Sequence, residues 1–183
     1  MEPIESEIEK AAGAIIEKAG INALTVDSLA LQMKIPKNEL PAYLKNEDDI
    51  LKFLASRLEN EIQQLINNLA AMNPDPEKEL SDLFKNLYDF YNRKSYFLDL
   101  MFADIIHVNA IAFASTLIKI RNDIKNYLIK ILEQGKKTGV FNYNINTRKE
   151  ADSVLNLFRF FMSDLPMTHK MVRDLKMLRE NEE

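Results

Sequence analysis

The side chains best suited to specific chemistry in this sequence lie close together, between Thr25 and Lys45. This segment holds three lysines and an asparagine, at Lys34, Lys37, Asn38 and Lys45. A lysine can bind phosphate or guanine, and an asparagine can pair with adenine, so such a group is typical of a nucleic-acid contact. The alternative for each of these residues is a solvated helical face, and the sequence leaves both readings open.

Catalytic and metal-binding chemistry have much weaker support. The 183 residues include no cysteine and two histidines, His107 and His169. Disulfides, thiolate catalysis and Cys-ligated zinc are therefore excluded, and little remains for any other metal site. The sequence contains no glycine-rich phosphate loop, no Ser, His and Asp arrangement that can be placed, and no distinguishable pair of catalytic carboxylates. We expect no enzyme activity, no metal and no cofactor.

The composition predicts an all-α globular protein. Apolar residues make up 46% and charged residues 28%, as in a globular protein. The sequence has no uncharged apolar run long enough to suggest a membrane span. The first ten residues, MEPIESEIEK, carry acids where a secretory signal would carry basic residues, so a cytoplasmic location is expected. Only four glycines are present, and an all-β fold would need more turn residues than that.

The first part of the chain predicts three short helices. Apolar residues at a spacing of three and four predict a helix over 4–19, which Gly20 can end. Thr25 is placed to cap a second helix over 26–33. Pro36 suits the first position of a third helix, about two turns long.

The third helix would have to pass a second proline, Pro41, to reach Tyr43. Longer helices are predicted beyond it, and about nine are expected in all. The signals for their ends are, in chain order, Asn46 as a cap, Asp75 as a cap before Pro76, a junction near 108–109, a stop at Gly139, a capping box of Thr147 with Glu150, and a last start at Pro166.

Two stretches of the sequence carry a family resemblance. AAGAIIEKAGINALTVDSLALQMKIPKNELPAYLKNEDDIL, residues 11–51, is similar to the amino-terminal pattern of the TetR family of bacterial transcriptional regulators. ILEQGKKTGVFNYNINTRKEADSVLNLF, residues 131–158, is a weaker match to the stretch before that family's dimerisation helices. The matched positions are Ala11, Ala12, Gly20, Thr25, Val26, Leu29, Ala30, Ile35, Leu40, Leu44, Asp49 and Ile50.

The resemblance implies a fold, partners and sites. It implies a helix-turn-helix DNA-binding domain over 1–46 and a helical effector-binding and dimerisation domain over 47–183, with a homodimer formed through the last two helices. The implied partners are double-stranded operator DNA and a small apolar effector. The expected DNA contacts are Thr25, Lys34, Lys37, Asn38, Tyr43 and Lys45. The expected ligand contacts are Tyr88, Tyr91, Phe97, Met101, Phe102 and His107, for which plain core packing is the alternative.

The sequence departs from the family pattern mainly where the family binds phosphate. Pro41 stands where a tyrosine commonly touches the DNA backbone, and Glu47 stands where a lysine does so. Residues 1–50 contain five lysines and ten acids, a net charge of −5 on the part that would meet a polyanion. Two functions therefore remain open: a ligand-controlled transcriptional regulator, or a TetR-fold ligand-binding or protein-interaction module with weakened or lost DNA binding.

Overall fold

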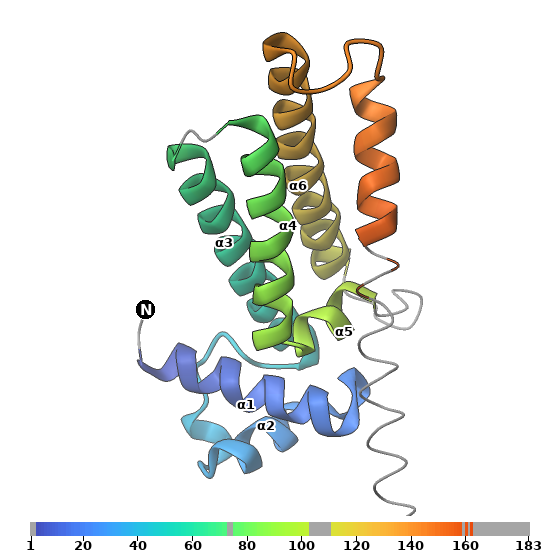
Figure 1. The fold of residues 1–183 in the computed structure, drawn as a ribbon. Coiled ribbons are helices and arrows are strands. Elements are labelled where there is room, and N and C mark those ends of the chain that lie inside the picture. The colour runs from blue at the N-terminus through green and yellow to red at the C-terminus, as the bar shows by residue number, and fades with distance from the viewer. Residues whose placement is uncertain (1–2, 73–74, 103–110, 159, 161, 163–183) are drawn as a thin grey trace, which may run out of the picture.

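The computed structural model describes residues 3–72, 75–102, 111–158, 160 and 162 (Figure 1). Every regular element in these residues is helical, which confirms the all-α prediction. The α-helices are α1 (Pro3–Ala19), α2 (Val26–Met33), α3 (Glu47–Met72), α4 (Pro76–Arg93), α5 (Tyr96–Phe102), α6 (Ile111–Thr138) and an unlabelled helix over 147–158. Two short 3-10 helices, η1 (Ile21–Ala23) and η2 (Lys37–Glu39), lie between α1 and α3.

Several of the predicted helix ends are confirmed by their hydrogen bonds. The Thr25 hydroxyl oxygen accepts a 3.0 Å bond from the Ser28 amide, and the Ser28 hydroxyl oxygen accepts one of 2.9 Å from the Thr25 amide. Asn46 caps α3 through the amide of Asp49, at 2.9 Å. Side-chain caps of this kind satisfy amides that have no partner inside the helix, and each contributes about 1 kcal/mol. Gly139 ends α6 at a φ of 78°, which favours glycine.

The third helix differs from its prediction. Residues 37–39 form one 3-10 turn instead of two α-helical turns, and Pro36 is its N-cap. Pro41 has no N–H to continue a helix, so the chain makes a separate turn in which the Leu44 amide donates to the Pro41 carbonyl at 2.9 Å. The described residues contain seven α-helices, whereas nine were predicted. The other missing helix, expected from Pro166, lies outside the described residues.

The cap predicted at Thr147 is displaced by one residue. Asn146 is the capping residue, because its side-chain oxygen accepts a bond of 3.1 Å from the Lys149 amide. Thr147 is already helical and buried, and its hydroxyl donates to Glu133 of α6 at 2.5 Å. The capping-box reading was wrong because Thr147 and Asn146 are both good capping residues, and the tertiary bond to Glu133 takes the threonine hydroxyl.

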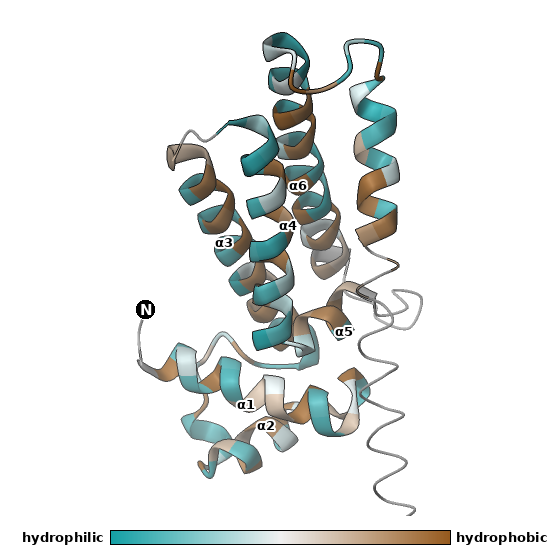
Figure 2. Ribbon diagram, in the orientation of Figure 1, coloured by the Kyte–Doolittle hydropathy of each residue, from teal (hydrophilic) through white to brown (hydrophobic). Residues whose placement is uncertain are grey.

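The core lies between α3, α4 and α6. Leu54 and Leu58 of α3 are fully buried, as are Leu83 of α4 and Leu117 and Leu128 of α6. Each buried side chain of this size contributes about 1.5–3 kcal/mol by leaving water. Figure 2 shows that these helices carry both hydrophobic and hydrophilic residues, as expected for helices with one buried face. No helix in the described ranges is both long and apolar enough to cross a bilayer.

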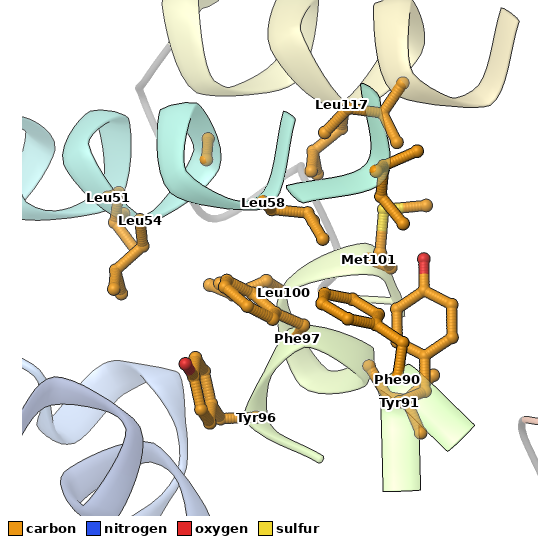
Figure 3. Packing of buried hydrophobic residues seen from close by; sticks show 14 of the residues in the cluster. Leu51, Leu54, Leu58, Phe90, Tyr91, Tyr96, Phe97, Leu100, Met101 and Leu117 are labelled. Atoms are coloured by element: carbon orange, nitrogen blue, oxygen red, sulfur yellow. The ribbon is translucent and has the colours of Figure 1, made fainter. Parts of the chain in front are cut away.

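The two amino-terminal helices lie together at one end of this bundle and contact it through α5 (Figure 1). We call α1 to η2, residues 3–39, the head, and the rest of the described chain the body. Tyr96 of α5 packs on Gly13 of α1 so closely that a Cβ at that position would lie 2.7 Å from the tyrosine ring. Figure 3 shows Tyr96 beside α1, at the edge of the buried cluster that includes Phe97 and Leu100.

A buried carboxylate ties the head to the body. Glu9 of α1 is 5% exposed. It accepts hydrogen bonds from Arg57 of α3 at 3.1 Å, from Lys94 after α4 at 2.6 Å and from the Tyr96 hydroxyl at 2.7 Å. Lys94 also bonds Glu61 at 2.5 Å. Burial alone would raise the pKa of Glu9, but the bonds from Lys94, Tyr96 and Arg57 outweigh it and hold that pKa below its ordinary value. We call these five side chains the Glu9 cluster.

Candidate functional site

Most of the predicted DNA-contact residues are exposed side chains of the head and of the loop that follows it. Lys34 ends α2 in the left-handed conformation, at a φ of 57° and a ψ of 38°, and is exposed. Asn38 in η2 and Lys45 in the following loop are exposed as well. All three side chains can therefore reach a partner in solution.

Two of the expected contacts already have local partners. The Lys37 ammonium lies 2.9 Å from a carboxylate oxygen of Asp27 in α2. Both side chains are largely exposed, and an exposed ion pair contributes at most about 1 kcal/mol, so a phosphate could displace Asp27. The Thr25 hydroxyl bonds Ser28 and caps α2, which accounts for this residue without any partner.

Tyr43 and Leu31 are exposed apolar side chains in the same part of the sequence. Tyr43 is 50% exposed, and its ring centroid lies 6.4 Å from that of Phe53 in α3. Leu31 is 79% exposed, one turn before Lys34 in α2. Leu31 was not predicted as a contact, although its position off the buried stripe of Val26, Leu29 and Ala30 was a signal. A leucine so placed can contact a thymine methyl group.

A cavity of about 300 Å³ opens in the body between α4, α5, α6 and the 147–158 helix. Most of its wall is apolar, with a polar group on one side, as in many small-molecule sites. Its lining residues are Leu87, Tyr91, Leu98, Met101, Arg121, Asn122, Ile124, Lys125, Asp152, Leu155, Asn156, Phe158 and Met162.

The polar wall of the cavity is positively charged overall. Arg121 donates a 2.6 Å hydrogen bond to the Met101 carbonyl oxygen, which fixes the end of α5 against α6. Lys125 forms an ion pair of 2.5 Å with Asp152 of the 147–158 helix. With two cationic side chains and one carboxylate among the described lining residues, the wall has a net charge of +1.

Tyr91 supplies a polar group on the apolar side. It is 4% exposed, and burial raises the pKa of its hydroxyl well above the ordinary value, although the nearby charge of Arg121 acts in the opposite direction. The hydroxyl is therefore protonated at neutral pH and can donate. Figure 3 shows it pointing toward Met101, which also lines the cavity.

The structure brings two of the six predicted ligand residues to this cavity, Tyr91 and Met101. Phe97 is instead fully buried, and its ring stacks on that of Phe90 with 5.7 Å between the ring centroids. Tyr88, on the outer side of α4, is 36% exposed and does not line the cavity. The Phe102 side chain and His107 lie outside the described residues.

The polar wall of the cavity was not predicted from the sequence. Arg121 and Lys125 are four positions apart in α6, so they share one face with buried Leu117 and Leu128. Two cations on an otherwise apolar helical face were a signal, whereas the predicted ligand contacts were chosen mainly among aromatic residues. The described residues contain no group of three or more potential metal ligands.

The arrangement of head, cavity and helical body defines a class of fold, that of TetR-type transcriptional regulators. The structure of the fatty acid degradation regulator FadR from Bacillus halodurans has a TM-score of 0.78, with 17% identity over 92% of this chain and 87% of that chain. The structure of the transcriptional regulator FadR from Bacillus subtilis, in complex with stearoyl-CoA, has a TM-score of 0.74. Its sequence is 17% identical, and the match covers 90% of this chain and 88% of that chain.

A third solved structure carries the family name. The TetR family transcriptional regulator PfmR from Thermus thermophilus has a TM-score of 0.73, with 18% identity over 85% of this chain and 84% of that chain. No protein-family model matches the sequence, and no curated protein matches it either. At these identities the likeness establishes the fold, and the function must be argued from this chain's own residues.

Proposed function

We propose that this protein is a TetR-like DNA-binding transcriptional regulator controlled by a small ligand with an apolar body. The observation that carries the proposal is that α4 and α5 line the cavity, and that residues at the end of α4 and in α5 also contact the head. Tyr91 faces the cavity, and Lys94, three residues later, holds Glu9 of the head. Met101 of α5 lines the cavity, while Tyr96 of the same helix packs on α1.

This connection gives the ligand a direct route to the head. A ligand that moves the end of α4 or tilts α5 also moves Lys94 and Tyr96, and the Glu9 cluster transmits that movement to α1. The head would then change position as a unit, because α1 and α2 are packed together through buried residues such as Ile16 and Leu29. Ligand control requires that the two positions of the head differ in ligand affinity.

DNA recognition would fall to the outer side of the head and the loop after it. The proposed contacts are Thr25, Leu31, Lys34, Lys37, Asn38, Tyr43 and Lys45. Their lysines supply the phosphate contacts and Asn38 and Leu31 the base contacts. The short η2 helix makes the reading surface smaller than two α-helical turns would.

We further propose that the protein works in the cytoplasm as a homodimer formed through its last two helices. Leu157 and Phe160 are 70% and 69% exposed on the first of these helices, and Ile118 on α6 is 53% exposed. Exposed apolar side chains of this size favour burial against a second copy. A dimer would present two heads to the two halves of a palindromic operator.

The test is a selection of genomic DNA fragments by the purified full chain at low salt. The proposal expects one recovered sequence with two related half-sites. A variant with Lys34, Lys37 and Lys45 all changed to alanine should recover none. Recovery of nothing above background by the unchanged protein would contradict the proposal.

A second function is favoured by the head itself. Its recognition element is a single 3-10 turn, Lys37 is paired with Asp27, and residues 1–50 carry a net charge of −5. These features suit a ligand-binding or protein-interaction module whose DNA binding is weakened or lost. Specific binding that falls steeply with salt would exclude this second function.

A further inference from the structure

The end of the body farthest from the head is basic. We call residues 135–149 the distal tip; they form the last turn of α6, the loop after it and the first turn of the 147–158 helix. Figure 1 shows this loop at the opposite end of the molecule from α1 and α2. The distal tip contains no acid and four cationic side chains, Lys136, Lys137, Arg148 and Lys149. Because the whole chain has a net charge of −4, the rest of it carries −8.

Three of these cations are available to a partner. Lys137, Arg148 and Lys149 are exposed, and none of their charged groups pairs with a carboxylate of the described residues. The acids that flank the distal tip, Glu133 and Glu150, are half-buried, and Glu133 already accepts a hydrogen bond from a threonine hydroxyl. The tip therefore presents an excess of positive charge that no described group neutralises.

The loop of the distal tip is held by its own contacts. The Phe141 amide donates to the Gly135 carbonyl oxygen at 3.0 Å, and the Phe141 ring occupies the space that a side chain at Gly135 would need. The Lys136 ammonium donates to the Ile145 carbonyl oxygen at 3.0 Å and lies 5.7 Å from the centroid of the Tyr143 ring. The exposed groups of the loop are therefore presented in a fixed arrangement.

Two apolar side chains project from the same loop. Tyr143 is 80% exposed and Val140 is 44% exposed. Lys136, Tyr143 and Arg148 line one shallow hollow, so the ring lies on the same surface as two of the cations. A nucleic-acid backbone would neutralise the cations but offers no apolar layer to these two side chains. The surface of a bilayer offers both, because lipid phosphates lie beside a boundary that takes tyrosine and aliphatic groups.

We propose that the distal tip binds the surface of an anionic phospholipid membrane. Lys137, Arg148 and Lys149 would contact the lipid phosphates, and Tyr143 and Val140 would enter the layer of head groups. Each lysine or arginine near such a surface strengthens binding about fivefold, so the three together contribute about a hundredfold. Residues 1–50 carry a net charge of −5, so the same membrane repels the head and orients it toward the solvent. The inference does not depend on the proposed function, because it uses none of the DNA-contact residues.

The first test is sedimentation of the full chain with lipid vesicles. One set of vesicles is phosphatidylcholine alone, and the other is phosphatidylcholine with about one third phosphatidylglycerol. Binding to the mixed vesicles should be at least about tenfold tighter than to the neutral ones. Raising the salt from about 0.1 M to about 1 M should abolish it, because the screening length falls from about 10 to about 3 Å. Equal binding to both vesicles, binding that resists salt, or no binding would overturn the inference.

The second test removes the exposed cations. A variant with Lys137, Arg148 and Lys149 all changed to alanine should lose about a hundredfold in affinity for mixed vesicles, with thermal unfolding within about 2 °C of the unchanged protein. The matched control is the variant with the three lysines of the head and the following loop changed to alanine, since it loses the same charge and should bind vesicles within about threefold. Equal losses in the two variants would overturn the inference. So would a distal-tip variant that loses affinity for DNA instead of vesicles, because the tip would then be a nucleic-acid surface.

A single tryptophan shows which end of the molecule meets the membrane. The chain contains no tryptophan, so Tyr143→Trp and Tyr43→Trp each introduce one reporter, the first in the distal tip and the second in the loop after the head. Both positions are at least half exposed. Mixed vesicles should shift the emission of Tyr143→Trp to shorter wavelength and leave that of Tyr43→Trp unchanged. A shift in Tyr43→Trp, or none in Tyr143→Trp, would overturn the inference.

Discussion

The Glu9 cluster gives the most quantitative prediction, through the variant Glu9→Gln. The amide keeps the shape of the side chain but removes the negative charge that Lys94 and Arg57 share. Removing one partner of a buried ion pair costs about 3–5 kcal/mol. The Lys94 side chain is 30% exposed and the Arg57 side chain 19%, so water can solvate both charges in part. We expect a loss of about 2–3 kcal/mol in the free energy of unfolding.

The assay is urea unfolding followed by circular dichroism at pH 7, supported by thermal unfolding. A loss of that size lowers Tm by about 4–12 °C in a chain of this length. Glu7→Gln is the matched control, because Glu7 is exposed on the same helix. If Glu9→Gln and Glu7→Gln differ by less than about 0.5 kcal/mol, the cluster does not hold the head to the body.

The Glu9 cluster also predicts how the free energy of unfolding changes with pH. The pKa of Glu9 is lower in the folded protein than its ordinary value of 4.5. The ionised carboxylate therefore stabilises the fold fully above about pH 4.5, and this contribution is lost as the pH falls through the folded pKa. The stability difference between the unchanged protein and Glu9→Gln should be constant from about pH 7 to 5 and shrink below about 4.5. A difference that grows in acid would refute this assignment.

Three further substitutions test the head and the loop that follows it. Gly13→Ala should cost about 1–3 kcal/mol of unfolding free energy in urea, because its Cβ would lie 2.7 Å from the Tyr96 ring; no loss would show that the ring moves freely. Thr25→Ala should cost about 1 kcal/mol in the same assay by removing the α2 cap, and Thr25→Ser should retain most of it. Lys45→Ala should reduce the slope of log affinity against log salt by about 1 for each phosphate that Lys45 binds, measured by fluorescence anisotropy on the recovered operator.

Local signals in the sequence were sufficient for most helix ends. Thr25, Asn46 and Asp75 bind amides in their own helices, so their role depends on neighbours within a few residues. The same reasoning failed at Thr147, where Glu133, fourteen positions earlier, takes the hydroxyl. A contact of that separation is set by how two helices pack and has no local pattern.

The prediction of a two-turn third helix failed for a reason that is visible in the sequence. Pro36 was read as a helix start, whereas Pro41 allowed no second turn, and a 3-10 turn is the most that fits between the two prolines. The two prolines therefore limit this element to one short turn.

The candidate cavity was predictable only in part. Tyr91 and Met101 were chosen for residue type and position, and both line it. Phe97 has the same chemical character but turns into the core against Phe90. The direction of a side chain depends on the packing of α4, α5 and α6 together, which periodicity within one helix does not determine. The place of Arg121 in the cavity wall could not be predicted for the same reason, because it depends on how α4 packs on α6.

The central claim, that the head and the loop after it bind DNA, is tested most directly by the salt dependence of binding to the operator recovered from genomic fragments. In a dimer, Lys34 and Lys37 of each head and Lys45 of each following loop can contact up to six phosphates. The logarithm of the association constant should then fall with log salt at a slope of about −5, and a scrambled sequence should bind much more weakly. Binding that is absent at low salt, or equal for both sequences, would contradict the account.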